Sequence, residues 1–161
     1  MEALEAIRKR RSVREYTGEP VPREELLKIL DAGRLAATGH NQQPWEFVVV
    51  TDRAMIDRLK VAAQWMEKAG AIIAVVMDPS SRWWVEDGAA AVENMLIAST
   101  ALGYGSCWLE GYTLPREEEL KGLLGIPADK RLLTLVPIGV PVKWPTREKK
   151  PLEEIVRWET Y

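Results

Sequence analysis

The sequence predicts a fold that mixes helices and strands, with about four strands and five or six helices in irregular order. Three dense runs of β-branched and apolar residues predict strands, at Trp45–Thr51, Ala71–Met77 and Leu132–Val140. Helical spacing of apolar residues separates them, and its longest stretch runs from Trp83 to Leu102. With 161 residues, 47% of them apolar and 29% charged, residues 1–161 are expected to form a single globular domain.

The N-terminal part is expected to begin with a short helix, whose apolar face carries Leu4 and Ile7 and which ends where a run of arginines begins. A turn-rich connector, Gly18–Pro22, leads to the second helix, and Pro22 suits its first position. The loop Thr38–Pro44 shows no hydrophobic period. The strand that follows this loop is predicted to be buried.

Asp52 is expected to cap a helix that continues from Arg53 to about Lys68. The long helix Trp83–Leu102 is rich in alanine, so other elements can approach it closely, and we expect it to be the central core helix. Gly103–Gly105 ends it. A short strand and a helix opened by Pro115 precede the last strand: Cys107–Leu109 and Arg116–Leu124.

Composition excludes several classes of function. The net charge is only −2, from 22 basic and 24 acidic residues, so no bulk field attracts nucleic acid or anionic lipid. One histidine and one cysteine cannot build a zinc site, so no metal is expected, and Cys107 is expected to be a small buried hydrophobe. No apolar signal segment or membrane-spanning run is visible, which makes the cytoplasm the expected location.

The most informative motif is Arg10-Arg11-Ser12-Val13-Arg14, directly after the first helix. Guanidinium groups stay charged and present forked donors that match phosphate oxygens, and a serine hydroxyl can complete such a cradle. Because the whole chain is nearly neutral, this local cluster favours a small anion over a long polyanion. Taken alone, a basic pentamer is more often a solvated surface patch.

Three other segments change that balance: Asn41–Phe47, Leu109–Tyr112 and the basic, proline-containing stretch Thr146–Pro151. Side-chain amides of the first segment both donate and accept, as the edge of an isoalloxazine ring requires. Gly111 in the second permits close approach to the backbone, because it has no Cβ. Together with the arginine motif, and in this order, the segments resemble the nitroreductase family of FMN-dependent oxidoreductases.

This resemblance implies an α+β nitroreductase-like fold, with a central, mainly antiparallel sheet flanked by helices. It also implies a homodimer that binds FMN at its interface. The tail from Pro141 to Tyr161 carries two tryptophans and a tyrosine, too apolar for a free arm. It is expected to fold back on its own sheet, or to be exchanged with or packed across a partner chain.

The implied reaction is hydride transfer from NAD(P)H to tightly bound FMN, followed by reduction of a nitroaromatic, a quinone or a similar small planar acceptor in a ping-pong cycle. The flavin N5 carries the hydride, so no side chain is assigned as catalytic with certainty. The resemblance implies these cofactor-binding residues: Arg10, Arg11, Ser12, Arg14, Arg147 and Lys149 at the phosphate, Asn41 and Gln43 at the ring, and Glu110 and Gly111 near N5.

Finer expectations accompany these assignments. Arg11 is the cradle residue expected to point outward, and Pro44 is expected to keep Gln43 extended. Longer family members place a lysine near flavin N1 and O2, where this chain has Gln64–Glu67. His40 is expected to face solvent rather than to donate a proton.

Three alternatives remain open at this stage. The chain could bind flavin without reductase turnover, as a store, a sensor or a partner module. It could instead be a small nucleic-acid-binding domain that uses Lys9–Arg14, although the near-zero net charge argues against this. Within the enzyme class, Glu110 could act as a general base rather than through its backbone.

Overall fold

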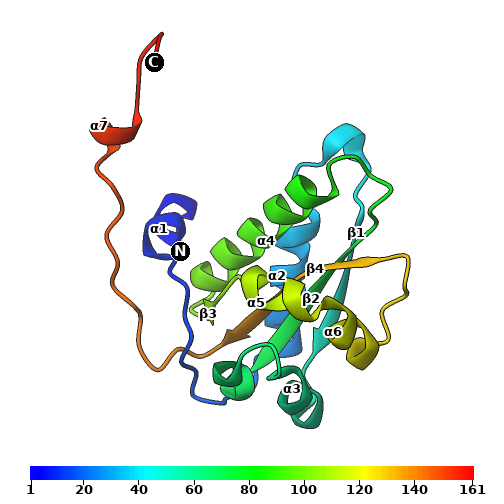
Figure 1. Cartoon of the computed structure of the whole chain (residues 1–161). Coiled ribbons are helices and arrows are strands. Elements are labelled where there is room, and N and C mark those ends of the chain that lie inside the picture. Colours follow the sequence, from blue (N-terminus) through cyan, green and yellow to red (C-terminus); the bar gives the residue numbers. More distant parts are fainter.

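The computed structural model describes residues 1–161 and contains one four-stranded sheet in the order β1-β2-β4-β3 (Figure 1). All three strand pairings are antiparallel. The predicted antiparallel sheet is therefore confirmed. Its strands are β1 (Trp45–Val50), β2 (Ala71–Met77), β3 (Gly105–Ser106) and β4 (Arg131–Gly139).

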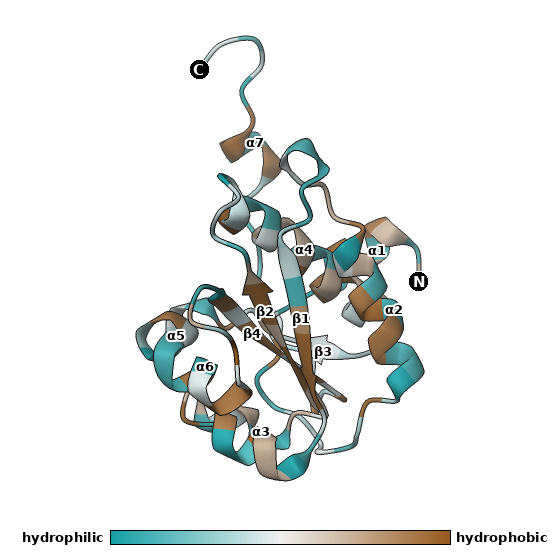
Figure 2. Cartoon of the chain, turned by 90° about the vertical axis from the view of Figure 1, so that its right-hand side faces the viewer, coloured by the Kyte–Doolittle hydropathy of each residue, from teal (hydrophilic) through white to brown (hydrophobic).

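Helices cover both faces of this sheet. α2 and α4 lie on one face, with α1 against α4, and α3, α5 and α6 lie on the other (Figure 2). No helix is both long enough and apolar enough to cross a membrane. The helices are α1 (Ala3–Lys9), α2 (Arg23–Arg34), α3 (Arg53–Leu59), α4 (Trp84–Ala101), α5 (Glu110–Thr113), α6 (Glu117–Leu124) and α7 (Leu152–Ile155), with 3-10 turns η1 (Gly39–Asn41), η2 (Gln64–Lys68) and η3 (Leu114–Arg116).

Strand β2 is buried along its whole length because both of its faces are covered. Ile72 and Ala74 belong to an apolar cluster with Ile56 of α3 and Leu120 of α6. Ile73, between them, points to the opposite cluster, which α2 and α4 supply. Side chains alternate across a strand, so burial on both faces explains why this run is almost continuously apolar (Figure 2).

The long helix α4 is the core helix that its small residues predict. Gly33 of α2 lies so close to it that an added Cβ would stand 2.8 Å from Cγ of Met95. Gly88 of α4 packs in the same way beneath Leu133 of the sheet. The helix stops at Gly103, whose φ of +89° is in the left-handed region where glycine carries no steric penalty.

The helix predicted from Arg53 to Lys68 is only partly confirmed. Asp52 does cap it, because its carboxylate accepts a backbone N–H at 2.8 Å. However, α3 ends at Leu59, and Ala63 is extended before the short turn η2 begins. Arg53 holds this arrangement together, since its guanidinium donates to two backbone carbonyls at the end of η2.

Two strand predictions are also corrected. The sequence predicts a buried first strand, but β1 is an edge strand and Val49 is 38% exposed. The predicted strand Cys107–Leu109 is displaced, because β3 ends before it and α5 begins at Glu110. The N–H groups of residues 107 and 109 still donate to carbonyls of β4, so the run follows that strand without forming a regular ladder.

Both ends of the chain expose apolar side chains. The apolar face of α1, which the sequence predicts to be packed inward, faces outward: Leu4 is 65% and Ile7 50% exposed. The small residue Ala6 is buried in its place. The C-terminal tail begins against the body of the protein, where Trp144 packs on the core, and then runs away from it without folding back on its own sheet (Figure 1). Its Leu152 and Trp158 are exposed.

The segment after α1 packs tightly on the sheet edge. The Val13 N–H donates to the Ser106 carbonyl at 2.9 Å, and the Tyr16 hydroxyl donates to the Val13 carbonyl at 2.7 Å. Val13 and Tyr16 are both buried. Gly105 makes this approach possible, because an added Cβ would lie 2.7 Å from the Val13 side chain.

Gly105→Ala should therefore lower the free energy of unfolding by about 1–3 kcal/mol, the usual cost of overpacking a tight contact. Urea denaturation measures the change. Gly122→Ala is the matched control, since Gly122 lies in α6 with open space around it, and alanine there should be neutral or stabilising. Equal denaturation midpoints for the two variants would contradict the close packing at Gly105.

Candidate functional site

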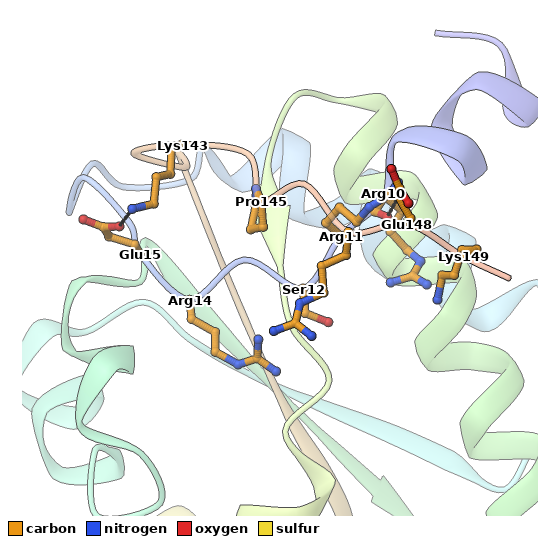
Figure 3. Close-up of a pocket in the computed structure, with 10 residues that line it drawn as sticks. Arg10, Arg11, Ser12, Arg14, Glu15, Lys143, Pro145, Glu148 and Lys149 are labelled. Carbon is orange, nitrogen blue, oxygen red and sulfur yellow. Dashed lines mark hydrogen bonds and ion pairs between the residues drawn. The ribbon is translucent and has the colours of Figure 1, made fainter.

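A basic cavity of about 610 Å³ lies between the segment after α1 and the beginning of the C-terminal tail (Figure 3). Six basic and two acidic residues line it, and no hydrophobic residue does. Ser12 contributes a hydroxyl to the wall. All six residues predicted for the phosphate cradle line this cavity: Arg10, Arg11, Ser12, Arg14, Arg147 and Lys149.

Backbone pairing brings these two distant segments together. The Thr17 N–H donates to the Val140 carbonyl, and the Val142 N–H donates to the Glu15 carbonyl, both at 3.0 Å. Lys143 reinforces this pairing, because its ammonium lies 3.3 Å from the Glu15 carboxylate (Figure 3). The chain leaving β4 is thus held beside the N-terminal segment, and its basic residues face the arginines.

Most of the positive charge in the cavity is not neutralised by the protein. Arg10 pairs with Glu93 of α4 at 2.9 Å, and Lys143 pairs with Glu15. The remaining cations form no ion pair: Arg11, Arg14, Arg147 and Lys149. An anion of two negative charges would therefore be strongly attracted to the basic cavity.

Arg11 differs from its prediction. It is half-buried rather than outward-pointing, and its guanidinium donates to the carbonyls of Arg8 and Arg10 at 2.8 and 2.7 Å. Its Nε is buried without an acceptor, an uncommon and costly situation for a charged donor. Arg14 is instead the exposed residue, and it lies over the ring of Trp65 at 5.9 Å.

Asn41 and Gln43 lie elsewhere in the protomer. Neither lines the basic cavity, and the loop that carries them lies beside the start of α4, whereas α1 lies toward the other end of that helix (Figure 1). The prediction that Gln43 is extended is wrong: its φ is +50°, because the loop folds back and the Gln43 N–H donates to the Thr38 hydroxyl at 3.3 Å. Gln43 lines a separate polar cleft of about 360 Å³, beside Ser81.

Glu110 and Gly111 lie in α5 rather than at the end of a strand. The turn begins where the Leu109 N–H donates to Thr134 Oγ1 and the Leu135 carbonyl, both at 3.1 Å. An added Cβ on Gly111 would meet no atom within 4 Å, so space is open above this backbone. Neither Glu110 nor Gly111 lines the basic cavity.

Two single residues have the expected environments. Cys107 is 1% exposed, and burial raises the pKa of its thiol, which keeps it protonated and unreactive. His40 is exposed, and its ring lies 5.4 Å from that of Trp83. Both findings agree with the sequence-based interpretation.

Sequence reasoning missed part of the cavity wall. Lys143, Pro145 and Glu148 line it but were assigned no role. Their signal was the density of charge in the stretch 143–150, which contains four basic residues, Lys143 among them, and one acidic residue. The backbone pairing that places this loop beside Glu15 joins residues that are distant in the sequence, so no local sequence pattern predicts it.

Comparison with known proteins identifies the family. The model of the nitroreductase family matches residues 7–69 and 57–140. A protein of Archaeoglobus fulgidus named "Putative NADH dehydrogenase/NAD(P)H nitroreductase" is 42% identical over 151 residues, which cover 87% of this chain and 86% of that protein. The chain belongs to the nitroreductase family. It is accordingly a nitroreductase-type oxidoreductase.

Solved structures of nitroreductases share its fold. A protein of the same description from Bacteroides thetaiotaomicron superposes with a TM-score of 0.92 at 33% identity, covering 99% of this chain and 98% of that one. A nitroreductase with bound FMN from Bacteroides fragilis gives a TM-score of 0.81 at 26% identity, covering 100% and 97%. The predicted nitroreductase-like α+β fold is thereby confirmed.

Proposed function

We propose that this nitroreductase binds FMN, takes hydride from NAD(P)H and reduces a nitroaromatic, a quinone or a similar small planar acceptor. The observation that carries the proposal is the basic cavity, which collects residues from both ends of the chain around unneutralised positive charge. The FMN bound to the relative from Bacteroides fragilis supports the choice of cofactor.

The donors in the basic cavity fit a phosphate monoester. Arg14 and Arg147 carry forked donors without acidic partners, and Ser12 adds a hydroxyl. The buried Nε of Arg11 lacks an acceptor that an anion would provide. These residues would hold the 5′-phosphate of FMN. When bound, FMN supplies the hydride-accepting and hydride-donating chemistry, and the protein supplies position and charge.

The ring would be bordered by residues of two copies of the chain. Asn41 and Gln43 lie apart from the basic cavity within one protomer, so one site that contains all the predicted residues requires a second copy. The open space above Gly111 would admit a ligand to the α5 backbone. NAD(P)H and the acceptor would then use the same exposed ring face in turn, in a ping-pong cycle.

Exposed apolar surface supports a homodimer in which the tail packs across the interface. Leu4 and Ile7 of α1 and Leu152, Ile155 and Trp158 of the tail are all at least half exposed in the single chain. Such surface is seldom left in water by a soluble protein. A second copy would cover it and would also complete the site.

The visible spectrum of the purified protein tests the function. We expect flavin absorption that bleaches when NADH or NADPH is added anaerobically and returns when a nitroaromatic or quinone is added. Persistent absorption would favour flavin binding without reductase turnover. A colourless protein that takes up no added FMN would contradict the assignment of the basic cavity.

Arg14→Ala should weaken FMN binding by about 1.5–3 kcal/mol, the usual contribution of a hydrogen bond to a charged group. Fluorescence titration of the apoprotein with FMN measures the change. Arg58→Ala is the control, because Arg58 is an exposed arginine of α3 outside the cavity. Equal affinities for both variants would remove Arg14 from the phosphate site.

Removal of residues 144–161 should lower flavin content and the dimer fraction together. The tail supplies two of the cations of the phosphate cradle, and it also carries the exposed apolar residues that a second copy would cover. Light scattering after gel filtration and the ratio of flavin to protein report the two losses. The double variant Arg147→Ala, Lys149→Ala separates them, since it should lose flavin but remain dimeric. A truncated chain that stays dimeric and yellow would show that the tail is dispensable.

A further inference from the structure

Asp87 is a buried carboxylate to which the proposed flavin chemistry gives no role. It lies in the first turn of α4 and is 5% exposed. Its Oδ1 accepts the backbone N–H of Gly39 at 3.0 Å, from a segment 48 residues earlier. Its Oδ2 is buried and has no hydrogen-bond partner. Burial of a carboxylate is costly, so its bond to one loop amide constrains that loop strongly.

The loop that receives this bond is conformationally strained. His40, Asn41 and Gln43 have φ values of +51°, +58° and +50°. Left-handed geometry at residues other than glycine is unfavourable and persists only where surrounding contacts enforce it. Three such residues within four positions indicate that the loop is held in one particular shape.

The contacts that enforce this shape converge on the start of α4. Gly39 packs against the ring of Trp83, the residue before α4, so closely that an added Cβ would overlap the ring. The Ser81 hydroxyl donates to Gln42 Oε1 at 2.9 Å. Among these partners, Asp87 alone is charged, and the N-terminus of α4 favours its negative charge.

We infer that Asp87 is a positioning residue: by accepting the Gly39 N–H it fixes the strained loop Thr38–Pro44, and so sets the direction in which Asn41 and Gln43 present their amides to the flavin. The inference rests on the proposed function, in which these two amides border the ring. Asp87 itself touches no cofactor in this scheme and acts only through the loop.

Asp87→Ala and Asp87→Asn test the inference together. The alanine variant should raise the FMN dissociation constant roughly tenfold, because the side-chain amides that hydrogen-bond the ring would be misplaced. The asparagine variant should stay within about threefold of the original protein, because its side-chain oxygen can still accept the Gly39 N–H. Fluorescence titration with FMN gives the constants, and hydrogen exchange of the Gly39 amide reports the bond directly.

Thr100→Val is the matched control for a purely structural effect. Thr100 is a buried residue of the same helix, and its hydroxyl donates to the Leu96 carbonyl at 3.0 Å. This substitution should lower thermal stability but leave FMN affinity unchanged. An alanine variant of Asp87 that is destabilised yet binds FMN normally would overturn the inference, as would an asparagine variant as impaired as alanine.

Failure of the proposed function has a different signature, because the unmodified protein would then bind no FMN at all. If Asp87→Ala does not fold, hydrogen exchange in the unmodified protein and in Asp87→Asn still tests the inference. The Gly39 amide should exchange slowly in both, on the scale of the buried amides of β2. Rapid exchange in the folded protein would show that Asp87 does not hold the loop.

Discussion

The pairing of residues 12–17 with the sheet edge is the constraint on which the rest of the site depends. Ser12 bridges to Ser106 of β3, and Tyr16 bridges to Pro141 beyond β4. The Tyr16 hydroxyl binds the Val13 carbonyl and also lies 3.2 Å from the Pro137 carbonyl, so one buried side chain fastens the segment to β4. Without this pairing, the arginines and the basic start of the tail would be two separate surface patches.

The same pairing explains which parts of the fold and of the site the sequence could predict. Strands β1, β2 and β4 and helix α4 are specified by apolar runs and small residues within one segment, so local patterns were sufficient to place them. The break after Leu59 and the exposed edge of β1 depend on what packs against them, and local patterns do not contain that information. The left-handed Gln43 is a further example, because Thr38 and the start of α4 impose its conformation.

For the site, short motifs indicated six of the residues that line the basic cavity, since each motif has its own charge signature, and their binding of a phosphate stays a prediction. They could not indicate that Arg11 turns inward, because it binds carbonyls that the C-terminal end of α1 leaves without helical partners, and the position of that end depends on the folded chain. Nor could they indicate Asp87. A single acidic residue at the start of a helix is common, and its partner Gly39 is distant in sequence.

Helix α4 connects the two separated parts of the proposed site. Asp87 in its first turn binds the loop that carries Asn41 and Gln43, and Glu93, farther along, pairs with Arg10 in the cradle. The helix packs against both α2 and the sheet, so these two acidic groups are fixed relative to each other. In a symmetric pair of chains, the α4 of one protomer would position the phosphate cradle of one site and the ring-bordering loop of the other. The geometry of both sites would then depend on the same rigid helix, which gives a physical reason for its close packing at Gly33 and Gly88.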